Sequence, residues 1–231
     1  MTRKQIDRLL ESLEDPTLIE THISWVVLAG DFAYKIKKPV RFSFLDFSTL
    51  DKRQHFCQRE ITLNRRLTEG IYLSVVPVNA MGSSILVDRA EGMILDYAVK
   101  MKRMPSDRQM HLMLERDEVT PLHMRQLADR LSTFHAYTDT VATPPDSDMM
   151  YDDFEDVDQV TSFLEEELES PIIEKITEAK VCARNFLDMH RKRIIQRHQL
   201  GFYIDGHGDL HSRNIFLLDA PVIFDCIEFN D

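Results

Sequence analysis

The pattern of hydrophobic residues changes at Pro105, and this change restricts the fold more than any other feature of the chain. Before Pro105, short apolar runs separated by turn residues are typical of strands, at 24–28, 32–36, 71–78, 84–87 and 93–101, with a turn expected at 79–83. Two helices are predicted in this part, one at the start of the chain that ends near Leu13 and one from Ser48 or Thr49 to about Leu67. From Pro105 to about Gln199, apolar residues recur at the spacing of helices, which predicts helices at 106–115, 121–138, about 154–168 and about 171–199. The chain therefore combines a strand-rich part with a helical part.

The last thirty residues return to strands. Two short apolar runs, 215–218 and 222–224, are joined by turn residues and follow a polar loop at 206–214. Strands first, helices second and then a loop on a small hairpin predict an α+β fold. We expect two lobes, a β-rich N-lobe at residues 1–104 and a helical C-lobe at residues 105–231.

Composition and charge narrow the class of protein. The chain of 231 residues has 28 Lys and Arg against 39 Asp and Glu, a formal net charge of −11, which argues against a nucleic-acid partner. No apolar run approaches the length of a membrane span, so no membrane partner is expected. The three cysteines cannot all pair and none lies in a Cys-x-x-Cys motif, which predicts a cytoplasmic protein.

The negative charge is concentrated between Asp146 and Glu169. This segment holds eleven acidic residues and no Lys or Arg. A solvated helix face with a flexible lead-in explains such a run, and we favour this interpretation. The alternative is an acidic wall for a cationic substrate.

The polar loop and the strand after it carry a pattern suited to phosphate transfer. Such a reaction needs a carboxylate to accept the proton of the attacking hydroxyl and oxygen ligands for Mg²⁺. Asp209 is followed five residues later by Asn214, and Asp225 at the end of the next strand can reach the same metal. The catalytic loop of protein kinases has the same Asp-to-Asn offset. His207 keeps the position two residues before the Asp.

This loop resembles the HGDLHxxN motif of aminoglycoside-phosphotransferase-like kinases, and Asp225 resembles the Asp that follows it. The matching residues are His207-Gly208-Asp209-Leu210-His211-Ser212-Arg213-Asn214. Segments 20–24, 34–40 and 225–230 resemble one bacterial branch of such proteins, often fused to a C-terminal P-loop kinase domain. The resemblance covers nearly the whole chain. It implies a protein-kinase-like two-lobe fold that binds ATP and Mg²⁺ and phosphorylates a small-molecule hydroxyl.

The resemblance also implies roles for individual residues. Asp209 resembles the catalytic base, and Asn214 and Asp225 resemble the Mg²⁺ ligands. Lys35 resembles the lysine that holds the α- and β-phosphates, and Glu60 resembles its partner on the following helix.

The helix pattern supports the pairing of Lys35 with Glu60 independently. Phe56, Glu60, Leu63 and Leu67 fall on one helical face. A carboxylate on an otherwise apolar face is costly unless it is paired. Lys35 is the natural partner because its own strand is apolar on either side.

Four residues of the C-terminal segment have a second interpretation. His207 is more simply a structural histidine that braces the loop, and His211 either contacts phosphate or packs against its neighbours. Asn214 could merely cap the hairpin. Glu228 is either an outer partner of the metal or an ordinary loop carboxylate, and the second is favoured.

The nucleotide site has its own alternatives. Lys37 and Lys38 compete with Lys35 for the phosphates, and alternation along the strand places Lys37 on the same face as Lys35. For the purine, we expect the backbone of Arg103 and Met104, where the strand-rich part leads into the helical part.

Two features depart from the family pattern. The chain has no G-x-G-x-x-G, and only Gly30 lies in the strand pair before Lys35, so the phosphate-covering loop is short or different. The chain also stops at Asp231, six residues past Asp225. We therefore expect a truncated C-lobe, as in a fragment of a longer protein.

Three functions follow from these patterns. The first is an ATP- and Mg²⁺-dependent phosphotransferase that acts on a small-molecule hydroxyl. The second is a catalytically weak nucleotide-binding module that regulates a larger protein. The third and last is a metal-dependent phosphoesterase, because Gly208-Asp209-Leu210-His211 resembles a GDxH element, although a dinuclear site would need more ligands.

Overall fold

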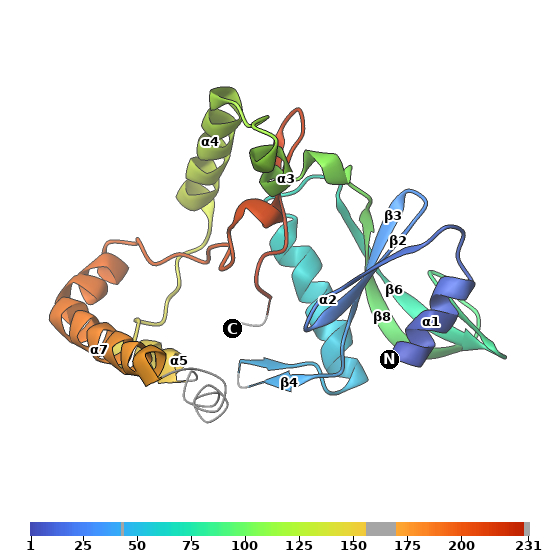
Figure 1. Cartoon of the computed structure of the whole chain (residues 1–231), viewed down its shortest axis with the longest axis horizontal. Coiled ribbons are helices and arrows are strands. Elements are labelled where there is room, and N and C mark those ends of the chain that lie inside the picture. The colour runs from blue at the N-terminus through green and yellow to red at the C-terminus, as the bar shows by residue number, and fades with distance from the viewer. Residues whose placement is uncertain (43, 156–169, 229–231) are drawn as a thin grey trace. The chain divides into compact units, whose positions relative to one another are not determined.

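The computed structural model describes residues 1–42, 44–155 and 170–228 and has a mixed α+β fold, as predicted (Figure 1). The chain divides into two compact units, Met1–Ala136 with His207–Asp231, and Tyr137–Gly206. The boundaries fall at residues 136 and 206 rather than at Pro105. Leu67, which comes before Pro105, is buried in the same hydrophobic core as residues of the first helices after Pro105 and of the C-terminal hairpin, so the chain does not divide at Pro105.

An antiparallel sheet of six strands forms the centre of the first unit. The strands are β1 (Thr17–Glu20), β2 (Ser24–Ala29), β3 (Phe32–Lys37), β6 (Tyr72–Met81), β7 (Ser84–Val87) and β8 (Met93–Lys102). Their order across the sheet is β1-β2-β3-β8-β6-β7, and every pairing is antiparallel. The strand β6 continues to Met81, so the turn expected at 79–83 is shorter than predicted.

The helix α1 (Arg3–Glu11) covers one face of the sheet. Thr2 caps this helix, and its hydroxyl and the Gln5 side chain form a capping box. Ile6 and Leu9 are fully buried in a core that includes Tyr34 and Ile36 of β3. Side chains alternate along a strand, so the intervening residues of β3 face the other side of the sheet.

The helix α2 (Leu50–Asn64) packs on that other side. Thr49 caps it, as predicted, by accepting a hydrogen bond from the Lys52 amide. Cys57 and Ile61 share a core with Ala33, which β3 directs toward this helix. The helix ends at Asn64 rather than near Leu67. Alternation along β3 places Lys35 and Lys37 on the same face as Ala33, toward α2.

A third core supports the polar loop. Its elements are η1 (Ser106–Arg108), α3 (Met110–Glu115), α4 (Pro121–Tyr137), η3 (Ser212–Asn214), β9 (Ile215–Leu217) and β10 (Pro221–Ile223). Met113, Leu127, Leu217 and Ile223 are buried together. The single helix expected at 106–115 is interrupted because Gln109 is extended and pairs with Phe216 of β9.

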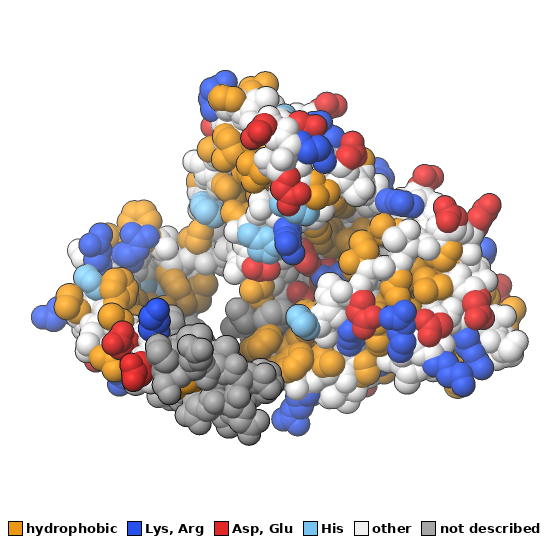
Figure 2. Space-filling model, viewed as in Figure 1, with side chains coloured by type: hydrophobic (Ala, Val, Ile, Leu, Met, Phe, Trp, Pro, Cys, Tyr) orange, Lys and Arg blue, Asp and Glu red, His pale blue; other side chains and the backbone are white. Residues whose placement is uncertain are grey.

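A small hairpin, β4 (Arg41–Phe42) with β5 (Leu45–Asp46), lies between β3 and α2 in the sequence and was not predicted. Leu45 is buried, whereas the stacked rings of Phe42 and Phe44 are exposed with their centroids 5.8 Å apart. Figure 2 shows acidic and basic side chains interspersed over the part of this unit that carries α1 and the sheet.

The second unit contains α5 (Ser147–Glu155) and the long helix α7 (Ser170–Gln199). The predicted helix from 171 to 199 is confirmed, with Gly201 just after its end. The helix predicted at 154–168 falls almost entirely outside the described residues. Thr140 and Ile204 pair as an isolated bridge where the chain enters and leaves this unit.

Candidate functional site

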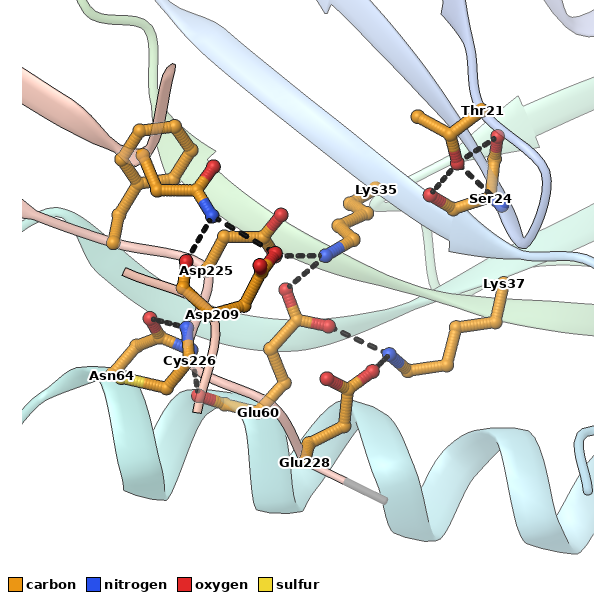
Figure 3. A network of polar contacts seen from close by, with 12 residues as sticks. Thr21, Ser24, Lys35, Lys37, Glu60, Asn64, Asp209, Asp225, Cys226 and Glu228 are labelled. Carbon is orange, nitrogen blue, oxygen red and sulfur yellow. Dashed lines mark hydrogen bonds and ion pairs between the residues drawn. The ribbon is translucent and has the colours of Figure 1, made fainter. Parts of the chain in front are cut away.

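A buried carboxylate on α2 binds two lysines of β3. Glu60 is fully buried, and its Oε1 lies 3.0 Å from Lys35 Nζ, while its Oε2 accepts a 2.7 Å hydrogen bond from Lys37 Nζ (Figure 3). The predicted contact between Lys35 and Glu60 is therefore present. Lys37 shares the same carboxylate, a contact that was not predicted from the sequence.

These charges hold one another in the ionised form. Burial alone would raise the pKa of Glu60, but Lys35 and Lys37 outweigh it and lower that pKa to about 2. Burial would lower the pKa of Lys35 and of Lys37, but the surrounding carboxylates raise both. All three groups are therefore charged at neutral pH.

Two carboxylates from the C-terminal segment complete this cluster. Lys35 Nζ donates to Asp225 Oδ1, and Lys37 Nζ donates to Glu228 Oε1 (Figure 3). The Asp225 side chain is 38% exposed, whereas that of Glu228 is 4% exposed. Asp225 can therefore reach a ligand, while Glu228 is enclosed. Burial raises the pKa of Glu228, although Lys37 opposes this effect.

His207 braces the loop that carries the predicted base. Its Nε2 donates to the Phe224 carbonyl at 2.9 Å, and its Nδ1 accepts from the Asp209 amide at 3.2 Å. Burial lowers the pKa of His207, which favours the neutral ring that these two bonds require. The structural interpretation of His207 is confirmed.

Asp209 and Asn214 lie against each other across the loop. Asn214 Nδ2 donates to the Asp209 carbonyl at 2.9 Å and to Asp209 Oδ2 at 3.3 Å. His211 Nε2 lies 3.5 Å from the same Oδ2. The backbone carbonyl of Asn214 also accepts a 3.0 Å hydrogen bond from the Phe224 amide. The residue before Asp225 is thus bonded directly to the loop.

The oxygen donors suit a hard divalent cation. Asp225 supplies a carboxylate, and Asn214, whose Nδ2 is turned toward Asp209, keeps its amide oxygen for a ligand. Mg²⁺ prefers such oxygen ligands and keeps several waters. Within the described residues, no three His, Cys, Asp or Glu side chains gather around one point. The predicted pair of Asn214 and Asp225 fits Mg²⁺ in its chemistry.

The backbone expected at the purine is partly engaged. The Arg103 amide donates to the Asp31 carbonyl at 2.8 Å, and the preceding amide of Lys102 donates to Ile71. A purine therefore cannot use the Arg103 N–H, contrary to expectation. The Arg103 carbonyl and the backbone of Met104 are the groups that could still meet a ligand.

The turn at the lysine end of the sheet contains no glycine. Strand register places Ser24 opposite Lys37, so the turn joining β1 and β2 lies at that end and Gly30 at the other. Thr21 Oγ1 accepts from the Ser24 amide at 2.9 Å and contacts the Ser24 hydroxyl at 2.9 Å (Figure 3). These hydroxyl contacts order this turn, which has no glycine-rich sequence.

Gly208 is required by the packing of the loop. Its φ is +83°, and a Cβ at this position would lie 3.0–3.2 Å from three carbons of Ile227. We expect Gly208→Ala to lower the free energy of unfolding by about 2–4 kcal/mol, from backbone strain and overpacking together. Urea denaturation measures this loss. Gly30→Ala is the control, since its φ is +51° but nothing lies within 4 Å; equal losses would contradict the role of Ile227.

The structure describes only part of the acidic segment between Asp146 and Glu169. Asp148 on α5 lies 3.0 Å from Arg184 and 3.4 Å from Arg191, both on α7. Its charge is thus balanced within its own unit. Six of the eleven acidic residues lie outside the described residues, namely Asp156, Asp158, Glu165, Glu166, Glu167 and Glu169.

Comparison with known proteins gives relatives but no family. No protein-family model matches the chain. Proteins of Mycobacterium bovis and of two Mycobacterium tuberculosis strains, each described as uncharacterized, are 30% identical over 221 residues. The match covers 92% of this chain and 41% of each relative, so the chain spans less than half of their length. In the part of the chain that the structure describes, none of the helices has the length and apolar character to cross a membrane.

Proposed function

We propose that the protein is an ATP- and Mg²⁺-dependent phosphotransferase that acts on a hydroxyl group of a small molecule. The observation that carries this proposal is the position of Lys35, which contacts Glu60 of the following helix and Asp225 together. A kinase needs both a strand lysine paired with a helix glutamate and a metal-binding Asp in place. The resemblance of residues 207–214 and 225 to aminoglycoside-phosphotransferase-like kinases supports the same function.

Lys35 is the group that would hold the phosphates of ATP. Its side chain is 10% exposed, and the ion pair with the buried Glu60 carboxylate orients its ammonium group. Lys35 is also bonded to Asp225. With Mg²⁺ and ATP bound, Asp225 would hold the metal and Lys35 would hold the α- and β-phosphates, while Glu60 would keep Lys35 charged.

Asp209 is the group that would accept the proton of the acceptor hydroxyl. Its side chain is 56% exposed, and Asn214 and His211 both approach its Oδ2. The hydroxyl proton would move to this carboxylate as the hydroxyl oxygen bonds to the γ-phosphorus of ATP, and the bond from that phosphorus to the departing oxygen of ADP would break. Mg²⁺, when bound by Asn214 and Asp225, would neutralise the charge of the phosphates.

The proposal makes a direct prediction for nucleotide binding. The wild-type protein should bind ATP only when Mg²⁺ is present, and Lys35→Met should weaken this binding roughly 10- to 100-fold, since a charged hydrogen bond is lost. Isothermal titration calorimetry measures both. Lys52→Met, which removes an exposed lysine paired with Asp46, should leave affinity unchanged. A wild-type protein that binds no ATP at saturating Mg²⁺ would refute the proposal.

A nucleotide-binding regulatory module is the second candidate. It is favoured by the length comparison, because the chain corresponds to 41% of its relatives and the residues that bind an acceptor could lie elsewhere in such a protein. If the protein is such a module, it should bind Mg²⁺ and ATP but transfer no phosphate to any hydroxyl in a panel of aminoglycosides, choline and sugars. If it is a phosphotransferase, it should transfer phosphate to at least one of these classes of acceptor.

A further inference from the structure

Four consecutive residues that include the proposed metal ligand Asp225 are each held by a different anchor. The Asp225 amide donates to the Tyr72 hydroxyl at 3.2 Å, and the Cys226 amide donates to Asn64 Oδ1 at 3.0 Å. The next amide, of Ile227, donates to the His207 carbonyl at 3.0 Å. Glu228 is held through its side chain by Lys37.

These anchors hold the backbone of Asp225 in a strained conformation. Asp225 has a φ of +66°, a left-handed conformation that residues with a Cβ rarely adopt. Such a conformation persists only where its surroundings enforce it. The segment therefore needs its anchors to keep the Asp225 carboxylate directed at Lys35.

Lys37 is the anchor with the most complete set of contacts. Its side chain is 1% exposed and binds Glu60, Glu228 and the face of the Phe47 ring, whose centroid lies 4.8 Å from Nζ. It touches neither Asp225 nor Asp209, and it is too deeply buried to meet a nucleotide. Lys37 instead connects the end of the segment to the same carboxylate that orients Lys35.

We infer that Lys37 is a positioning residue: through Glu228 it fixes the segment Asp225–Glu228, and thereby presents the Asp225 carboxylate to a divalent cation before any ligand arrives. This inference deepens the proposed function and rests on it. Groups that orient a metal ligand without touching the metal typically change metal affinity 10- to 100-fold when removed.

The experiment compares Lys37→Met with Arg53→Met. Arg53, on α2, is also buried and forms a buried ion pair with Asp96 at 2.8 Å. Its partners Asp96 and Phe47 lie outside residues 225–228. The Mg²⁺ concentration for half-maximal ATP binding is measured at a temperature where each variant is folded. We expect a 10- to 100-fold increase for Lys37→Met and less than a two-fold change for Arg53→Met.

Glu228→Gln is the second variant, because it keeps the size of the side chain and removes only the charge that Lys37 binds. If Lys37→Met does not fold, Glu228→Gln decides, with an expected increase in the same direction. An unchanged Mg²⁺ requirement in folded Lys37→Met or Glu228→Gln, or an equal increase in Arg53→Met, would overturn the inference and leave Lys37 a structural residue.

Amide hydrogen exchange separates this inference from the proposed function. In the wild type, the amides of Asp225, Cys226 and Ile227 should be protected, and Lys37→Met should lose this protection while Arg53→Met keeps it. A wild-type protein that binds no Mg²⁺ and ATP refutes the phosphotransferase, whereas the exchange result alone tells whether Lys37 fixes the segment. Unchanged protection in Lys37→Met overturns the inference whether or not ATP binds.

Discussion

Replacing Asp209 by Asn should lower the rate of phosphate transfer about 10²- to 10⁴-fold, which is the usual contribution of a general base. Asn has the same shape and can still accept the bond from Asn214, but it cannot take a proton from the acceptor. The affinity for Mg²⁺ and ATP should stay close to the wild-type value, since Lys35, Asn214 and Asp225 are unchanged. Steady-state kinetics with the best hydroxyl acceptor in a panel measure kcat, and calorimetry measures affinity.

The matched control is Asp219→Asn in the exposed turn between β9 and β10. It makes the same chemical change ten residues away and should leave kcat unchanged. If Asp209→Asn kept more than a tenth of the wild-type kcat, Asp209 would not be the base. If its kcat fell only as ATP affinity fell, Asp209 would act as a metal ligand instead.

Local patterns predicted the central parts of the site. The contact between Lys35 and Glu60 followed from a carboxylate on an apolar helix face, since burial demands a partner within reach. The strands 24–28 and 32–36 and the cap at Thr49 were also predicted correctly, because their signals lie within a few residues of one another.

Long-range and weakly patterned features escaped prediction. Lys37 meets Glu228 across 191 residues, and nothing local distinguishes such a glutamate from an ordinary loop carboxylate. The strand β1 has only one partly buried residue, Leu18, so it shows no alternation. The Arg103 amide was assigned to a ligand because strand register cannot be read from one strand alone. The register pairs Phe32 with Lys102 and so brings Asp31 beside Arg103.

Replacing Glu60 by Gln should lower the free energy of unfolding by about 3–5 kcal/mol at neutral pH, as for other broken buried ion pairs. The change removes the carboxylate that two buried ammonium groups share and leaves them with Asp225 and Glu228. Urea denaturation at pH 7 measures the loss. Glu118→Gln, an exposed carboxylate paired with Arg116, should change stability very little.

The pH dependence of this loss identifies its electrostatic origin. The folded protein holds the pKa of Glu60 at about 2, below its usual value of 4.5, so the unfolded chain binds the proton first as the pH falls. The stabilisation from Glu60 is therefore complete above pH 4.5 and disappears between about 4.5 and about 2. The stability difference between wild type and Glu60→Gln should shrink over this same range. A difference that stays constant down to pH 2 would show that packing, rather than charge, makes Glu60 necessary.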